Sequence, residues 1–196
     1  MYQRILAAAA VVMVLGGCAA PFTAVEPGPV AVANMQISPQ ATWNRAAATL
    51  APFSRKDAEV WTRDGMLLNR LLIIPAVSDG ESIFAVPGKT AALPVFRADM
   101  LPNEIEEMIE SSMVKLLGEG DSTVSTSNLR PAKFGERRGV MFDFRGQLTD
   151  GPDYKGVVGS VVADEKLYVV IYFGADPYYF EKHRDEAEAI IKSARI

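Results

Sequence analysis

The sequence of 196 residues contains one cysteine and one histidine, and its longest apolar run, near the N-terminus, is shorter than a membrane span. With Cys18 alone, no disulfide can form within the chain, so stability must come from an apolar core. A single histidine, His183, argues against a zinc site, and we expect neither a metal nor a cofactor. The formal net charge of -4 argues against nucleic-acid binding, which needs a basic surface.

The first residues have the pattern of a bacterial export signal. Arg4 supplies positive charge, and residues 5–15 form an apolar run of eleven residues, whereas a transmembrane helix needs roughly 20. Leu15, Gly16, Gly17 and Cys18 follow, and this stretch resembles the bacterial lipobox. The resemblance implies cleavage between Gly17 and Cys18. It also implies that Cys18 receives a diacylglycerol and usually a further acyl chain such as palmitate.

Two or three acyl chains hold a protein stably on a membrane, whereas one chain binds only marginally. Residue 19 is Ala rather than Asp, a pattern that resembles sorting to the outer membrane rather than retention at the inner membrane. We therefore expect a protein anchored on a membrane and facing the periplasm. An ordinary secretory signal or a plain N-terminal anchor helix is the alternative.

The sequence predicts three regions: a signal peptide over residues 1–17, a lipidated cysteine with a flexible tether over 18–40, and one α+β domain over 41–196. The tether is predicted because residues 19–40 contain four prolines among small residues and no sustained periodicity. Trp43, Ala46, Ala47 and Leu50 recur at helical spacing, which is consistent with a short helix between Trp43 and Phe53.

A hairpin and a helix are expected next. Residues 58–62 predict a strand, Asp64 and Gly65 a tight turn, and residues 66–74 a returning strand that ends before Pro75. Pro102 is typical of a helix start, and apolar residues three and four apart continue the pattern as far as Gly118.

The C-terminal half predicts more strands and a closing helix. Residues 123–129 favour a weak strand, and residues 138–173 an antiparallel meander. Asp176 is predicted to cap the last helix, with Pro177 as its first residue. Phe180, His183 and Ala187 lie on its apolar stripe.

From about residue 57 onward this order of elements resembles the PsbP-like α/β/α sandwich, an antiparallel sheet flanked by helices. The ending at Phe180, Ile190, Ile191 and Ser193 carries part of the resemblance. The chain also resembles uncharacterised proteobacterial lipoproteins in the stretches 60–64 (VWTRD) and 96–104 (FRADMLPNE). Neither resemblance implies a function, because one fold hosts many functions.

His183 is the one residue suited to acid–base catalysis near neutral pH. Its place on an apolar stripe favours a hydrogen-bonded structural histidine over a catalytic one. The alternative is an esterase-like envelope hydrolase that uses Ser122 or Ser160 with His183.

Aromatic and basic residues suggest a binding surface. Trp43, Trp61 and Arg63 are its candidates, because aromatic side chains and arginine dominate contact energy in interfaces. The alternative is that both tryptophans close the core.

We expect a non-catalytic domain that binds an envelope protein, a glycan or a lipid. A structural role in the assembly of an envelope complex is the other non-enzymatic alternative.

Overall fold

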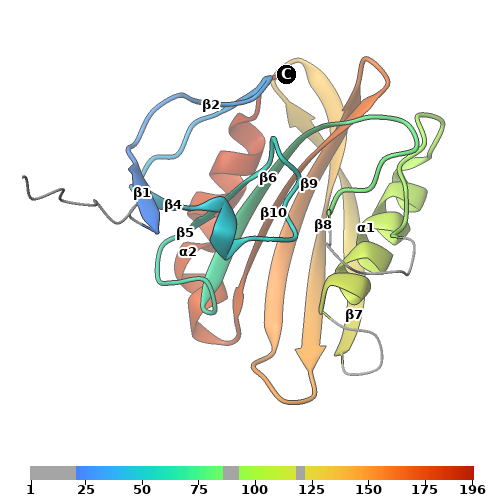
Figure 1. Ribbon diagram of the computed structural model, residues 1–196. Helices are drawn as coiled ribbons and strands as arrows, with labels where there is room; N and C mark the ends of the chain where they lie inside the picture. Colours follow the sequence, from blue (N-terminus) through green and yellow to red (C-terminus); the bar gives the residue numbers. More distant parts are fainter. Residues whose placement is uncertain (1–20, 86–92, 118–121) are drawn as a thin grey trace, which may run out of the picture.

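The computed structural model describes residues 21–85, 93–117 and 122–196. One eight-stranded antiparallel sheet lies between two helices, with α1 over one face and α2 over the other (Figure 1). Across the sheet the strands are β1 (Phe22–Val25), β4 (Trp43–Ala46), β5 (Glu59–Thr62), β6 (Asn69–Val77), β10 (Lys166–Ala175), β9 (Tyr154–Ala163), β8 (Arg137–Leu148) and β7 (Ser122–Phe134). The predicted α+β class, an antiparallel sheet flanked by helices, is confirmed.

The remaining elements are short or helical. A separate two-stranded sheet pairs β2 (Val30–Val32) with β3 (Met35–Ile37), and the 3-10 helix η1 (Ala48–Leu50) follows β4. The two α-helices are α1 (Pro102–Leu117) and α2 (Tyr178–Ser193). The helix predicted from Pro102 is confirmed, and Glu104 Oε2 accepts a hydrogen bond of 2.7 Å from the backbone N–H of Leu101, as expected of a carboxylate in a first turn.

The predicted meander is present as β8, β9 and β10, and it divides the interior into two cores. Along β9, Val157 and Val161 pack on the α2 side, while Val158 packs on the α1 side. This alternation follows from the period of two in a strand. Both faces are covered, so β10 is a continuous apolar run rather than an alternating one.

Helix α2 lies close to the sheet because β9 carries a glycine beneath it. A Cβ atom added at Gly159 would lie 2.2 Å from Cγ2 of Ile191, a separation that no real Cβ contact shows. The absent side chain therefore sets how near α2 can pack.

The predicted tether over residues 18–40 is wrong for residues 22–37. This segment forms β1, β2 and β3, and four of its side chains are buried against the α2 side of the sheet: Val25, Val32, Met35 and Ile37. Pro27, Pro29 and Pro39 lie between or after these strands, so they interrupt no strand hydrogen bond. The folded unit thus begins well before the predicted boundary at residue 41.

The helix predicted between Trp43 and Phe53 is also wrong. Trp43 begins β4, which pairs with both β1 and β5, and only η1 is helical in this range. The neighbouring strands β1 and β5 supply hydrogen bonds to the backbone of β4, and this pairing outweighs the weak helical spacing of the apolar residues.

Three smaller boundaries differ from the prediction. Strand β6 begins at Asn69 rather than at residue 66, because residues 63–68 form a longer turn than the tight Asp-Gly turn predicted. Strand β6 continues through Pro75 to Val77, because its register with β10 shifts by a bulge at this point, where proline is tolerated. Helix α2 begins at Tyr178, and Asp176 makes no cap; its Oδ1 lies 2.9 Å from Nζ of Lys155 in an ion pair.

Candidate binding groove and the histidine network

The predicted surface of Trp43, Trp61 and Arg63 does not form. Trp43 and Trp61 are each 0% exposed and belong to the core on the α2 side. Two buried rings cannot contact a partner, so the alternative that the tryptophans close the core is correct. Arg63 follows β5 and covers this core from outside, with its Cζ atom 6.0 Å from the ring centre of Trp43.

Arg63 instead belongs to a polar network centred on the single histidine. His183 lies on α2 and is 6% exposed. Its Nε2 lies 2.7 Å from Oδ2 of Asp64, and its Nδ1 lies 3.2 Å from an Arg63 guanidinium nitrogen. An arginine can only donate, so Nδ1 accepts and Nε2–H donates to the carboxylate. The contacts therefore hold a neutral imidazole in one tautomer.

The electrostatics agree with that assignment. Burial lowers the pKa of His183 below 6.5; the hydrogen bond to Asp64 opposes this shift, and the Arg63 cation adds to it. Partial burial raises the pKa of Asp64, but hydrogen bonds from Lys182 and His183 outweigh it and the net shift is downward from 3.8. A carboxylate beside an uncharged imidazole is the resulting state at neutral pH.

This network joins the turn after β5 to helix α2. Lys182 Nζ lies 2.5 Å from Oδ1 of Asp64, and Nδ2 of Asn69 donates to Oδ2 of the same carboxylate. Asp64 lies in the turn of residues 63–68, between its own hairpin and helix α2. Sequence reasoning missed the pairing because the partners are 119 residues apart.

The two serines of the hydrolase alternative lie across the sheet from His183. Residues two apart in a strand lie on the same face of the sheet. Ser160 is two residues from Val158 on β9, and Ser122 is two residues from Val124 on β7, and both valines pack on the α1 side. Both serines therefore lie on the α1 side. His183 belongs to the α2 side, where it contacts Trp43. The sheet therefore separates the histidine from both serines, and no Ser–His pair forms. In addition, Ser160 is 1% exposed.

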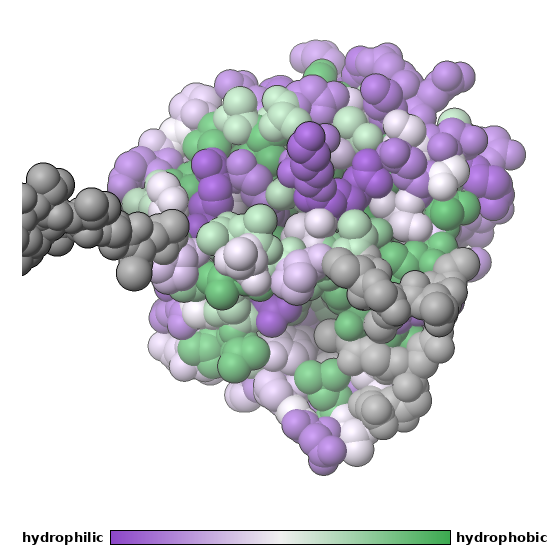
Figure 2. Space-filling view, viewed as in Figure 1, coloured by the Kyte–Doolittle hydropathy of each residue, from purple (hydrophilic) through white to green (hydrophobic). Residues whose placement is uncertain are grey.

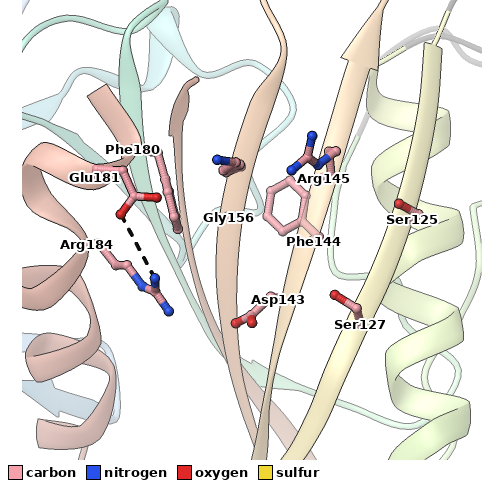
Figure 3. A pocket seen from close by; sticks show the side chains of 10 residues that line it. Ser125, Ser127, Asp143, Phe144, Arg145, Gly156, Phe180, Glu181 and Arg184 are labelled. Carbon is pink, nitrogen blue, oxygen red and sulfur yellow. Dashed lines mark ion pairs between the residues drawn. The ribbon is translucent and has the colours of Figure 1, made fainter. Parts of the chain in front are cut away.

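A polar groove lies on the α2 side of the sheet, between the first turns of α2 and strands β7, β8 and β9. It has a volume of about 300 Å³. Glu181 and Arg184 of α2 form one wall, and Asp143 and Arg145 of β8 face them (Figure 3). Hydroxyl and ammonium groups of Ser125, Ser127 and Lys155 add to the polar lining, and Phe144, Gly156 and Phe180 also line the groove.

Most of the charged side chains in the groove form ion pairs with neighbouring residues. Arg184 pairs with Glu188 at 3.2 Å, and Asp143 pairs with Arg130 at 3.0 Å. Arg145 is exposed and has no ion pair within 4.0 Å among the residues that the structure describes. The groove thus offers one uncommitted cation together with hydroxyl groups, an arrangement suited to hydrogen-bonding a polar ligand. His183 does not line it.

Within the described ranges, no three His, Cys, Asp or Glu side chains come together to hold a metal ion. None of the helices described is long and apolar enough to span a membrane. The predicted cleavage and lipidation residues, Gly17 and Cys18, lie outside the described residues, as do residues 1–16.

Comparison with known proteins supports the fold. No protein-family model matches the chain, and no curated protein matches its sequence. Among solved structures, the chain is similar to cyanobacterial PsbP (CyanoP) from Synechocystis sp. PCC 6803, determined in solution. The TM-score is 0.58 at 10% sequence identity, over 92% of this chain and 95% of that one. The chain therefore has a PsbP-like fold, and at this identity the likeness extends to the fold alone.

Proposed function

We propose that this protein is a lipid-anchored component of the bacterial envelope whose domain binds a partner without catalysing a reaction. One observation carries the non-catalytic part: both ring nitrogens of His183 are engaged by Arg63 and Asp64. A general base needs a free nitrogen within reach of a reacting group. The only histidine instead joins two elements of the fold, and both candidate serines lie on the opposite side of the sheet.

The anchoring part rests on the sequence from Arg4 to Cys18. Metabolic labelling with a palmitate analogue, followed by membrane fractionation, tests it on the native protein and on Cys18→Ser. We expect label and membrane association in the native protein and neither in the variant. A native protein that is unlabelled and leaves the membrane fraction would refute the anchor. Separation of inner and outer membranes then tests the outer-membrane location that Ala19 suggests.

The binding part is assigned to the groove between α2 and β7–β9. A photo-crosslinking residue at Ser127 should capture one partner, protein or glycan, in intact cells. The same residue at Lys133, exposed on the same strand but outside the groove, should not. Arg145→Glu should abolish capture at Ser127 while the protein keeps its unfolding midpoint. Capture that persists in Arg145→Glu would place the partner elsewhere.

The hydrolase alternative is tested directly on the serines. Hydrolysis of a chromogenic short-chain ester should be no faster with the native protein than with Ser122→Ala or Ser160→Ala. Activity that either substitution abolishes would overturn the non-catalytic assignment.

A further inference from the structure

The N-terminal segment fixes which edge of the domain lies nearest to the anchor. Phe22 pairs with Ala46 at the β1 edge of the sheet, and the backbone N–H of Ala47 donates to the carbonyl of Pro21 at 2.9 Å. The chain from Cys18 to Pro21 spans at most about 11 Å. A lipid on Cys18 is therefore held close to β4 and η1, within the reach of three residues from Pro21.

The surface beside this point has the composition of a membrane contact. Leu50 of η1 is 40% exposed. A hollow of about 470 Å³ adjoins it between β4, η1 and β5, lined largely by small apolar residues and by three cations, Arg45, Arg55 and Lys56, against one carboxylate, Glu59. Cations beside exposed apolar groups suit the interface of an anionic bilayer.

Ion pairs neutralise two of the three cations that line the hollow. Arg45 pairs with Glu59 at 2.6 Å and Arg55 with Glu81 at 2.7 Å. Lys56 is exposed and, over the described residues, has no ion pair within 4.0 Å. Asp57 follows it in sequence but does not line the hollow. Lys56 is thus the cation free to meet a phosphate.

We propose that η1 and the adjoining hollow rest on the lipid surface, and that they orient the domain with its β1 edge toward the membrane. This rests on the anchoring proposed above. Weak contacts suffice, because a covalent anchor already holds them at high local concentration. On the face seen in Figure 2, hydrophobic surface is broken into separate patches between polar residues, which favours a local contact beside the anchor over a broad apolar face.

The opposite edge of the sheet then points away from the membrane. Eight strands about 4.8 Å apart place β7 roughly 34 Å from β1. The groove lies at this far side, where a partner in the periplasm can reach it. Leu129 of β7 is 38% exposed, and it gives a matched control for Leu50.

The test uses the full, lipidated protein in vesicles of phosphatidylethanolamine and phosphatidylglycerol that contain a nitroxide-labelled lipid. A thioether at Cys18 leaves an introduced cysteine as the only free thiol, so an environment-sensitive fluorophore is attached at Leu50→Cys or at Leu129→Cys. Strong quenching at position 50 and little at position 129 is expected. Thr49→Cys on η1 and Lys133→Cys on β7, two exposed positions, repeat the comparison if either leucine variant misfolds.

The outcomes separate the two proposals. A protein that fails to float with the vesicles, and whose Cys18 also takes the fluorophore, refutes the anchor. A protein that floats but is quenched equally at both edges, or at neither, keeps the anchor and overturns the orientation.

Discussion

Asp64 and His183 are joined by a 2.7 Å hydrogen bond across 119 residues of sequence. Arg63 lies on the other side of the imidazole, at 3.2 Å. The turn after β5 and helix α2 are thereby fixed to each other through a ring that is neutral in the folded protein.

This arrangement predicts a pH dependence of stability. The folded-state pKa of His183 is lowered below its ordinary 6.5, so between the two values the unfolded chain binds a proton that the folded chain does not. The free energy of unfolding should therefore fall as pH drops from about 7.5 through 6.5, and level off below the folded-state pKa. Each tenfold difference in proton affinity between the two states amounts to about 1.4 kcal/mol.

Denaturant unfolding at pH 7.5 and pH 5.5 measures this slope. In His183→Gln the amide can still donate to Asp64 but does not titrate, so the slope over this range should disappear. The lowered pKa of Asp64 does not affect this slope, because the stability that it contributes is lost only when pH falls below about 3.8. An equal slope in both proteins would contradict the assignment of the proton to His183.

Gly159→Ala should destabilise the protein by about 1–3 kcal/mol, because the added methyl meets Ile191 of α2 and the ring of Phe134. Gly151→Ala is the control, since the three atoms nearest to its added Cβ all belong to the side chain of Leu148, with Cδ1 at 3.0 Å. Thermal unfolding of both variants tests the difference. Equal midpoints would mean that α2 can move away from β9 at little cost.

Ile37→Ala should cost about 2–5 kcal/mol, the range for truncating a fully buried side chain, since Ile37 is 0% exposed. Gln36→Ala on the same strand should change stability by less than about 0.5 kcal/mol. Its side chain is exposed, and the backbone bonds between Gln36 and Arg195 remain. Chemical denaturation of the two variants provides the measurement. If Ile37→Ala leaves the free energy of unfolding unchanged, residues 22–37 do not contribute to the core and act as a tether.

Glu110→Ala should expose an edge of the sheet. Glu110 Oε2 accepts hydrogen bonds from the N–H of Thr126 at 2.8 Å and from its hydroxyl at 2.6 Å. This protects part of the outer edge of β7, where an unpaired strand invites association. We expect a loss of about 1 kcal/mol and faster hydrogen exchange at the Thr126 amide. Glu107→Ala, exposed on the same helix, should leave that amide unchanged.

The sequence predicts the fold best where the apolar residues recur with a single helical or strand period. The stripe of α1 and the alternating or continuous apolar strands of the meander carry strong local signals, and both elements were predicted. Residues 22–37 were not, because strands of three or four residues give too short a pattern and the prolines between them suggest a coil. The burial of β1 depends on pairing with β4 and that of β3 on contacts with α2, and no local pattern contains either partner.

The candidate site was predicted less well than the fold. Residue type predicts a surface of Trp43, Trp61 and Arg63, but the sheet buries both rings, and the guanidinium of Arg63 contacts His183. The groove is lined by residues of β7, β8, β9 and α2. Which residues line it depends on how much of the sheet α2 covers. The face on which a serine lies depends on strand register, which no local pattern around Ser122 or Ser160 specifies.

The contact between Ser38 and Ser193 joins residues 155 positions apart, and Gln36 pairs with Arg195 beside it. During synthesis β3 emerges early, yet its partners Ser193 and Arg195 emerge only about 155 residues later. The hairpin of β2 and β3 must therefore dock late, and contacts of such long sequence separation slow folding. A chain interrupted before α2 would keep Val32 and Ile37 uncovered, and both would be open to proteases and chaperones.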